Sequence, residues 1–254
     1  PGWIVTTEQL SREEEMIQKT VLIAGASRGL GLNFARKYLE EGWCVLAGVR
    51  GDGHPGENSI GGVKRKYPDS LYPLRMDLPD PASVEEAAKK AGEITERIEL
   101  VINNAGIHGP SSREILEVTN LDECAAVYDV NAVGPLRVVK AFLPLIAGNG
   151  EGMIVNISSE SGSIGTARRE KEFDYCMSKA ALNMATKLLD NYLSSRGIRV
   201  IAVHPGWMRT DMGGQNADLD PYETAVQLAD LFAGIDRTDR TLLFMDNEGK
   251  EIPW

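Results

Sequence analysis

Apolar residues in this chain gather in short runs, separated by longer stretches in which they recur every three or four positions. A short apolar run is typical of a strand buried on both faces of a parallel sheet, and the longer spacing is typical of a helix. The runs predict seven strands, over residues 20–24, 44–49, 71–76, 100–102, 153–157, 199–204 and 241–245. The spacing between them predicts helices over 32–41, 81–97, 121–145, 175–196 and 221–233, with a short helical turn near 63–67.

Strands alternating with helices predict an α/β fold. We expect a Rossmann-type, doubly wound, seven-stranded parallel sheet with helices on both faces. Residues 20–254 form a single domain in this interpretation, without linkers, repeats or low-complexity segments. Residues 1–19 form a polar arm, in which Ser11 and Glu14 are spaced as the capping box of a short helix.

Two predicted helices carry informative side chains. In 121–145, Asn131 lies close to Gly134 and Pro135, a combination that predicts a local distortion of the helix. In 175–196, four apolar side chains at helical spacing predict the stripe that faces the core: Ala181, Met184, Leu188 and Tyr192.

Charge and composition narrow the function classes. The formal net charge of −10 argues against nucleic acid or an anionic membrane as a partner. No apolar run approaches the ~20 residues that span a bilayer, and the N-terminus lacks the basic-then-apolar pattern of a signal peptide. Three widely spaced cysteines favour reduced thiols and a cytoplasmic location. The three histidines show no metal-ligand spacing, so we expect no metal.

The first predicted strand runs directly into Gly25-Ala-Ser-Arg-Gly29-Leu-Gly31, and a helix follows. Strand, glycine turn and helix in this order are typical of a dinucleotide site, because the glycines allow close backbone approach and the helix N-terminus attracts a pyrophosphate. The spacing is GxxxGxG rather than the common GxGxxG. A turn shaped only for packing is the alternative.

The end of the second strand bears on which nucleotide binds. Val49 stands near the position where NAD sites carry an acidic residue, and Arg50 follows it. Together with Arg28 of the glycine turn, Arg50 favours NADP(H) over NAD(H), because arginines recognise a phosphate by bidentate bonding. Asp52 is counter-evidence, although glycines on both sides favour a turn there.

Later strand ends carry further candidates. Asp77, followed by Leu78, could bond an adenine amine or cap the next helix. Asn103-Asn104-Ala105-Gly106 fits the ligand crevice of an open α/β sheet, or a simple turn. The polar stretch from Pro205 to Asp220 leaves the sixth strand and is typical of a mobile loop that closes over ligands.

Tyr175 and Lys179 are four positions apart and therefore share one helical face. An ammonium beside a phenol favours the ionised form and lowers its pKa, which suits the phenol to proton transfer. The same spacing arises by chance in many surface helices, so the pair needs support from the rest of the chain.

Four stretches in order supply that support: the glycine turn, 103–106, the pair Ser158-Ser159, and 175–179. Together they resemble the short-chain dehydrogenase/reductase family over residues 20–254. His204-Pro-Gly-Trp-Met-Arg-Thr-Asp-Met-Gly-Gly214 and the closing Glu-Ile-Pro-Trp resemble its sniffer or C-factor-like carbonyl reductases. The resemblance implies a cytoplasmic NADPH-dependent reductase of aldehydes, ketones or quinones, assembled as a homodimer or homotetramer through the helices that carry Tyr175 and Asn131.

The resemblance also implies roles for individual residues. Tyr175 would protonate the carbonyl oxygen, Lys179 would lower its pKa and bond the nicotinamide ribose, and Ser159 would hold the carbonyl. Asn131 would position a water behind Lys179. Besides Tyr175 and Lys179, the expected cofactor contacts are Gly25, Ser27, Arg28, Gly29, Leu30, Gly31, Arg50, Asp77, Leu78, Asn104, Ala105, Gly106, Pro205, Gly206, Trp207 and Thr210.

Some alternatives stay open. The interval from Ser159 to Tyr175, 175 − 159 = 16 residues, is longer than is usual in the family, and the charged run 168–172 occupies it. That run could shape the substrate entrance or bulge into solvent. Ser158 could replace Ser159, since adjacent strand residues face opposite ways. A non-catalytic NADP(H)-sensing regulator and an NAD-dependent alcohol dehydrogenase are the competing functions.

Overall fold

The computed structural model of the chain describes residues 18–51 and 56–254. The expected capping box at Ser11 and Glu14, and Asp52, lie outside these residues. Seven parallel strands form one sheet in the order β3-β2-β1-β4-β5-β6-β7, which confirms the doubly wound prediction. The strands are β1 (Thr20–Ala24), β2 (Cys44–Val49), β3 (Leu71–Arg75), β4 (Leu100–Asn103), β5 (Met153–Ile157), β6 (Arg199–Val203) and β7 (Phe244–Met245).

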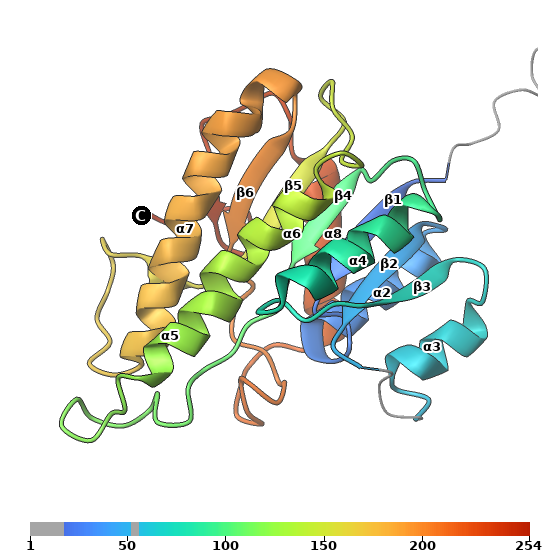
Figure 1. The fold of residues 1–254 in the computed structure, drawn as a ribbon. Helices are drawn as coiled ribbons and strands as arrows, with labels where there is room; N and C mark the ends of the chain where they lie inside the picture. Colours follow the sequence, from blue (N-terminus) through green and yellow to red (C-terminus); the bar gives the residue numbers. More distant parts are fainter. Residues whose placement is uncertain (1–17, 52–55) are drawn as a thin grey trace, which may run out of the picture.

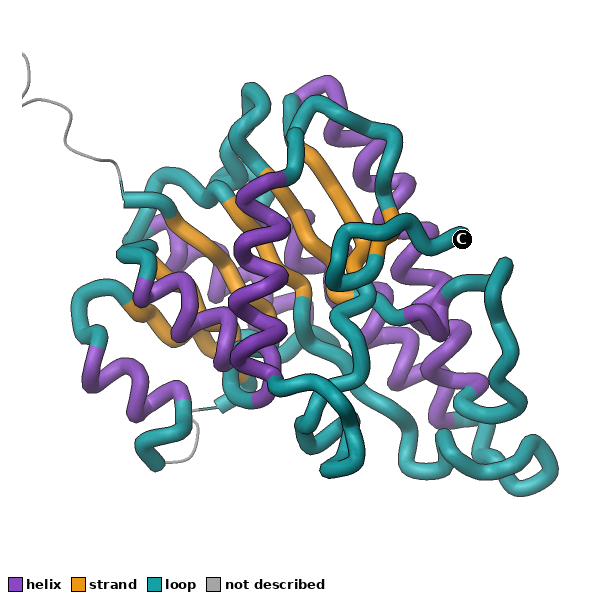
Figure 2. The backbone as a smooth tube through the Cα atoms, turned by 180° about the vertical axis from the view of Figure 1, so that it is seen from behind, coloured by secondary structure: helices purple, strands orange, loops and turns teal. Residues whose placement is uncertain are grey.

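Helices cover both faces of the sheet (Figures 1 and 2). One layer contains α4 (Pro81–Gly92), α5 (Glu123–Tyr128), α6 (Gly134–Phe142) and α7 (Phe173–Leu193). The opposite layer contains α2 (Gly29–Glu40), α3 (Ile60–Lys66) and α8 (Pro221–Gly234). None of the helices formed by residues 18–51 and 56–254 is long and apolar enough to cross a bilayer.

Two apolar cores separate the sheet from its helical layers. Successive side chains of β1 point to opposite faces, so Val21 and Ile23 join one core while Leu22 and Ala24 join the other. The first core receives the apolar faces of α2, α3 and α8, and the second receives those of α4 and α6. Strands buried on both sides explain the uninterrupted apolar runs in the sequence.

The last strand is shorter than predicted. The sequence predicts a strand over 241–245, whereas only Phe244 and Met245 pair with β6. The reason is a local turn in which the carboxylate of Asp239 accepts the backbone N–H of Thr241 at 2.8 Å and also bonds its hydroxyl. This side-chain bonding satisfies the backbone there without a neighbouring strand.

Two predicted helices end or divide differently. The helix predicted over 81–97 stops at Gly92, and Thr95 then bonds the backbone of Arg97 in a turn. The helix predicted over 121–145 is interrupted by η1 (Asp129–Val133), one π-helical turn between α5 and α6. The distortion expected around Asn131 is therefore confirmed.

The predicted core stripe of the long helix is wrong. Met184, Leu188 and Tyr192 on α7 are 61%, 59% and 64% exposed. The buried face of α7 instead carries several polar side chains, each with a specific partner inside the protein. Thr186, for example, accepts a hydrogen bond from Asn156 of β5 at 2.8 Å.

Candidate active site

The candidate site lies where the chain leaves the carboxyl ends of neighbouring strands. Ala24 of β1 is aligned with Asn103 of β4, which is aligned with Asn156 of β5. The loops that follow these strands consequently start at one edge of the sheet, next to the β1–β4 switch point where open α/β sheets bind ligands.

The glycine turn after β1 packs closely against neighbouring backbone, at distances that only glycine permits. Gly25 has a φ of +86°, and a Cβ atom there would lie 2.8 Å from the backbone of Ala105. A Cβ atom on Gly31 would lie 2.1 Å from the carbonyl oxygen of Gly25. The helix α2 then begins after Arg28 with no side-chain cap and no acidic residue in its first turn. Its free N–H groups fit an anionic group such as a pyrophosphate.

The other strand ends lie beside this turn. The Asn104 side chain donates a hydrogen bond to the carbonyl of Gly25 at 2.8 Å. The carboxylate of Asp80, not that of Asp77, caps α4 by accepting the N–H of Ala82. The capping alternative for Asp77 is therefore wrong, while Leu78 is buried beside it.

The lid loop, which we define as residues 205–220, reaches the glycine turn. Arg28 forms a 2.8 Å ion pair with Asp211, and the Thr210 side chain lies 3.4 Å from the Cβ position of Gly29. The indole of Trp207 donates a hydrogen bond to Gly213 while remaining half exposed. The loop thus lies over the glycine turn, and its mobility stays a prediction.

Tyr175 and Lys179 lie on the inner side of α7. The ammonium of Lys179 is buried, donates a 2.7 Å hydrogen bond to the carbonyl of Ile157, and lies 5.5 Å from the centre of the Tyr175 ring. Burial lowers the pKa of Lys179 to about 8. Although Tyr175 shares the same helical face, the Lys179 ammonium points at a backbone carbonyl.

The predicted lowering of the tyrosine pKa is wrong for this structure. Burial raises the pKa of Tyr175 above the usual phenol value, and the nearby Ser159 hydroxyl and the charge of Arg169 offset only part of that rise. A raised pKa keeps the phenol protonated at neutral pH. The proton is therefore present on Tyr175, although burial makes the phenol a weaker acid than a phenol in water.

The two adjacent serines point to different places. The Ser158 hydroxyl donates a 2.6 Å hydrogen bond to the buried Asn183 side chain, away from Tyr175. Ser159, in contrast, lies close enough to Tyr175 to favour the ionised phenol and so to lower its pKa, and the Ser159 hydroxyl donates a 2.9 Å hydrogen bond to the carboxylate of Glu160. The geometry thus brings Ser159, and not Ser158, to the tyrosine.

Asn131 sits in η1 with its side chain fully buried. Its amide oxygen accepts the backbone N–H of Ile107 at 2.8 Å, and its amide nitrogen donates to the carbonyl of Ile107 and to the Ser178 hydroxyl. The side chain therefore fixes the segment that follows β4 against α7. A Cβ atom at Gly106 would lie 3.6 Å from both Asn131 and Lys179, so these groups converge.

Sequence reasoning missed an aromatic contact at the site. The ring of His108 stacks on the Tyr175 ring, with centroids 4.0 Å apart and an angle of 14°. Burial lowers the pKa of His108, against the opposing charges of Glu172 and Asp174. The position of His108, two residues beyond the 103–106 strand end, is the one signal that could have placed it at this edge.

The charged run 168–172 also reaches the site. Arg169 lies between two carboxylates and forms ion pairs with Glu160 and Glu172. Burial tends to raise the pKa of Glu160, but hydrogen bonds from Ser161 and Arg169 outweigh it and hold that pKa below its usual value. The run is exposed, as expected for a solvated loop, yet it touches the residue that bonds Ser159.

Comparisons with known proteins place this arrangement in a family. The family model described as "short chain dehydrogenase" matches residues 19–220. Human 17-beta-hydroxysteroid dehydrogenase type 2 is 36% identical over 210 residues, which are 81% of this chain and 51% of the relative. The chain spans about half the length of the first curated relatives it matches.

Two solved structures share most of the fold. The NADPH-bound carbonyl reductase from chicken fatty liver is 31% identical with a TM-score of 0.82, and the match covers 93% of this chain and 99% of that one. The carbonyl reductase Sniffer of D. melanogaster is 27% identical with a TM-score of 0.85, and the match covers 93% and 100%.

Proposed function

This chain belongs to the short-chain dehydrogenase/reductase family, and from that premise we propose that it reduces a small aldehyde, ketone or quinone to the alcohol with NADPH. The observation that carries the proposal is the placement of Tyr175. The Lys179 ammonium lies 5.5 Å from the centre of its ring, and the Cβ position of Gly106 lies 3.6 Å from both Lys179 and Asn131, so the three side chains of a proton-transfer site converge on one place. The chicken and D. melanogaster carbonyl reductases support the same direction of reaction.

Each residue has one task in the proposed reaction. NADPH, when bound, would supply the hydride. Tyr175 donates its phenolic proton to the carbonyl oxygen, and Ser159 bonds the same oxygen as negative charge develops on it. Lys179, whose ammonium lies 5.5 Å from the ring, stabilises the phenolate that Tyr175 becomes. We assign Asn131 to positioning water behind Lys179, in addition to its bonds to Ile107.

The chain's own residues fit a phosphorylated dinucleotide. The uncapped start of α2 suits the pyrophosphate, while Arg28 and Arg50 are the exposed cations nearest the end of β2 and the glycine turn. We therefore propose NADP(H) as the preferred cofactor. A solved relative that contains NADPH supports this choice.

We also propose assembly and location. The apolar side chains exposed along α7 continue on α5 and α6 with Tyr128 and Leu136, and a second copy of the chain is the occupant that best covers them. This supports a homodimer or homotetramer. Cys44, Cys124 and Cys176 are free thiols, which fits a reducing cytoplasm.

The direct test is Tyr175→Phe, which removes the proton donor and keeps the ring that stacks on His108. We expect NADPH-dependent turnover of a panel of aldehydes, ketones and quinones to fall by about 10²- to 10⁴-fold, while NADPH still binds. Tyr72→Phe, on the exposed edge strand β3, is the matched control and should keep parental activity. Equal turnover by Tyr175→Phe and the parent protein would disprove the assignment.

A further inference from the structure

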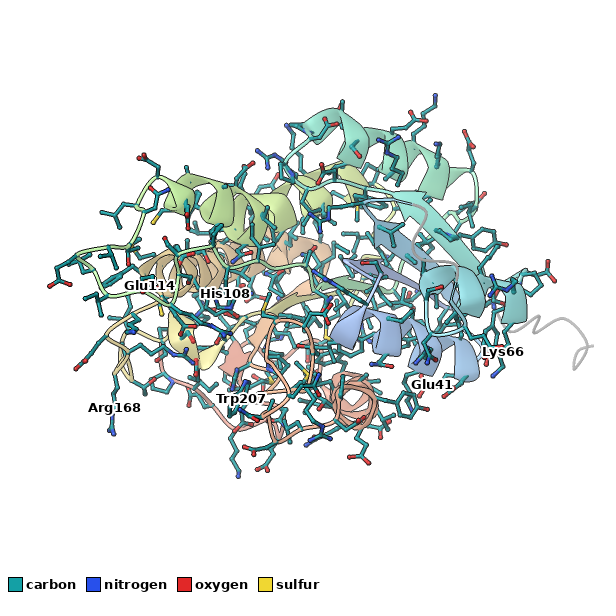
Figure 3. All side chains as sticks on the ribbon, turned by 90° about the horizontal axis from the view of Figure 1, so that it is seen from below. Glu41, Lys66, His108, Glu114, Arg168 and Trp207 are labelled. Carbon is teal, nitrogen blue, oxygen red and sulfur yellow. The ribbon has the colours of Figure 1, made fainter. Side chains whose placement is uncertain are left out.

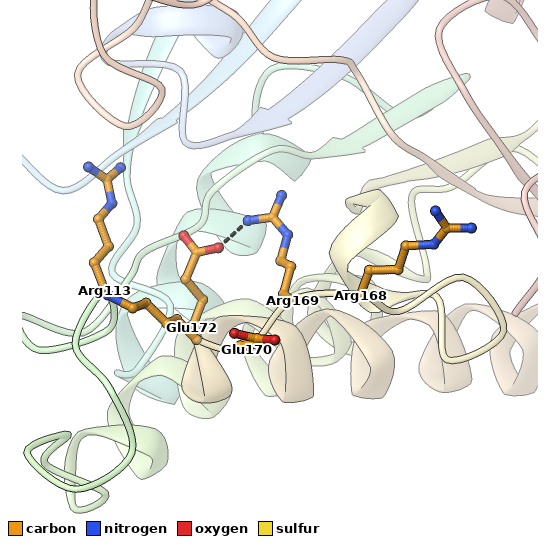
Figure 4. Close-up of a pocket in the computed structure, with 6 residues that line it drawn as sticks. Arg113, Arg168, Arg169, Glu170 and Glu172 are labelled. Carbon is orange, nitrogen blue, oxygen red and sulfur yellow. Dashed lines mark hydrogen bonds and ion pairs between the residues drawn. The ribbon is translucent and has the colours of Figure 1, made fainter.

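An open cavity of about 540 Å³ lies beside the candidate active site. Five of its lining residues are consecutive in the loop before α7, and the sixth comes from the segment after β4 (Figure 4). We call it the basic cavity; its lining residues are Arg113, Arg168, Arg169, Glu170, Lys171 and Glu172.

The residues that line the basic cavity carry a net charge of opposite sign to that of the whole chain. The chain has 37 acidic and 27 basic residues and a net charge of −10. The lining has four basic and two acidic side chains, so its formal charge is 4 − 2 = +2. A local positive field in an acidic protein attracts anions and repels cations.

Part of this positive charge is free to bind a ligand. Arg169 is engaged by Glu160 and Glu172, and Arg113 donates one hydrogen bond to the carbonyl of Met212. The side chains of Arg168 and Lys171, in contrast, have no hydrogen-bond or ion-pair partner among residues 18–51 and 56–254. Both are exposed to solvent.

The cavity is connected to the reacting groups through two short chains of contacts. On one side, Arg169 pairs with Glu160, whose carboxylate lies 2.9 Å from the hydroxyl of Ser159. On the other, Glu172 lies 3.9 Å from His108, which stacks on Tyr175. Arg113 also links the cavity to the lid loop through Met212. The cavity is therefore separated from Ser159 by Glu160 and from Tyr175 by His108, each a single side chain.

We infer that the basic cavity binds a carboxylate on the substrate, so that the protein acts on oxo acids in preference to neutral carbonyl compounds. This rests on the proposed reductase function and specifies its substrate class. Arg168 provides a planar fork that matches a carboxylate, and Lys171 adds a mobile point charge. The carboxylate itself is unchanged, since hydride and proton both go to the carbonyl group.

A matched pair of substrates tests the inference. In 4-carboxybenzaldehyde and methyl 4-formylbenzoate the aldehyde is the same, and only the first is anionic at neutral pH. With saturating NADPH, we expect the parent protein to show a higher kcat/KM for the acid, through a lower KM. Raising the salt concentration should reduce that preference, because these charges are exposed.

The variant Arg168→Glu should lower the acid-to-ester ratio of kcat/KM by on the order of tenfold, since it replaces an attraction by a repulsion. Lys66→Glu changes the net charge equally and should leave that ratio unchanged. Figure 3 shows Arg168 and Lys66 at opposite ends of the molecule. An acid-to-ester ratio that is the same in parent and Arg168→Glu overturns the inference, although turnover of both aldehydes still supports the reductase.

Binding of benzoate, followed by ligand-observed NMR, separates the two proposals without any turnover. If neither aldehyde is reduced, the proposed function fails, and the inference then depends on benzoate alone. Benzoate signals that broaden with the parent protein and sharpen with Arg168→Glu support the carboxylate site. Equal broadening with both proteins, or none with either, overturns it.

Discussion

Burial shifts the pKa values of Tyr175 and Lys179 in opposite directions. Withdrawal from water disfavours the charged form of each group, so it raises the pKa of the phenol and lowers the pKa of the ammonium. The neutral phenol and the cationic ammonium therefore coexist only below the lowered lysine pKa. This limit fixes the pH range in which the pair can work.

The first prediction follows from that limit. Since Lys179 has a pKa of about 8, its positive charge is present below that pH and is lost above it. We expect kcat/KM for NADPH-dependent carbonyl reduction to be level near neutral pH and to fall as pH rises through about 8. A pH–rate profile with a neutral aldehyde measures this.

Lys179→Arg is the informative comparison, because a guanidinium keeps its charge far above this range. Whatever activity this variant retains should show no fall near pH 8. An identical fall in the variant would assign the titration to another group.

For single side chains, the sequence predicted which residues share a helix or a strand end better than it predicted their burial, orientation and pKa. The spacing of Tyr175 and Lys179 correctly put them on one helix, and the strand ends correctly came together. The direction of the Tyr175 pKa could not be read from spacing, because burial and the orientation of Lys179 towards Ile157 decide it. His108 was likewise out of reach, since its stacking on Tyr175 joins residues far apart in the chain.

The helix α7 shows what determines which face of an element is buried. Its most regular apolar stripe faces solvent, while polar side chains face the protein interior. The interior position is stable because these polar side chains have hydrogen-bond or ion-pair partners there. Asn183 bonds Ser158, and Asp190 accepts the backbone N–H of Val200 and pairs with Arg240. Buried polar groups with complete hydrogen bonding cost little. Helical periodicity finds the stripe, but it cannot identify such partners on distant strands.

The element η1 gives a second prediction. Asn131→Ala removes the partner of both the N–H and the carbonyl of Ile107, leaving two polar groups without hydrogen bonds in the interior. We expect the free energy of unfolding to fall by roughly 2–4 kcal/mol. Urea unfolding at a fixed protein concentration measures this change.

Asn131→Asp keeps the acceptor for the Ile107 N–H but places a buried carboxylate oxygen against the Ile107 carbonyl, so its loss of stability at neutral pH should be at least as large. Equal stability of Asn131→Ala and the parent would show that water replaces these bonds at no cost.

At the scale of the whole molecule, the outer face of α7 and its neighbours α5 and α6 expose several apolar side chains. Exposed apolar patches of this kind mark association sites. The proposed homo-oligomer buries Met184, Leu188 and Tyr192 against a second copy. Helical spacing assigned them to the core of the chain, and the structure corrects this because all three are exposed.

The third prediction concerns this face. Leu188→Arg places a charge in the apolar stripe and should shift the protein to a smaller species in sedimentation velocity. Ile164→Arg, at an exposed aliphatic residue of the loop after β5, should leave the sedimentation coefficient unchanged. A parent protein that sediments as a monomer at all concentrations would contradict the proposed assembly.

The short strand β7 and the proline in β3 affect how readily the edges of the sheet can pair with a strand of another molecule. At one margin of the sheet, Pro73 lacks the N–H that an incoming strand would need. At the other, the outer side of Phe244 already accepts the N–H of Ile252, and Met245 pairs antiparallel with Glu251. Neither margin can template another strand, which protects the native protein from fibrillar growth. Concentrated samples should therefore resist amyloid-type precipitation.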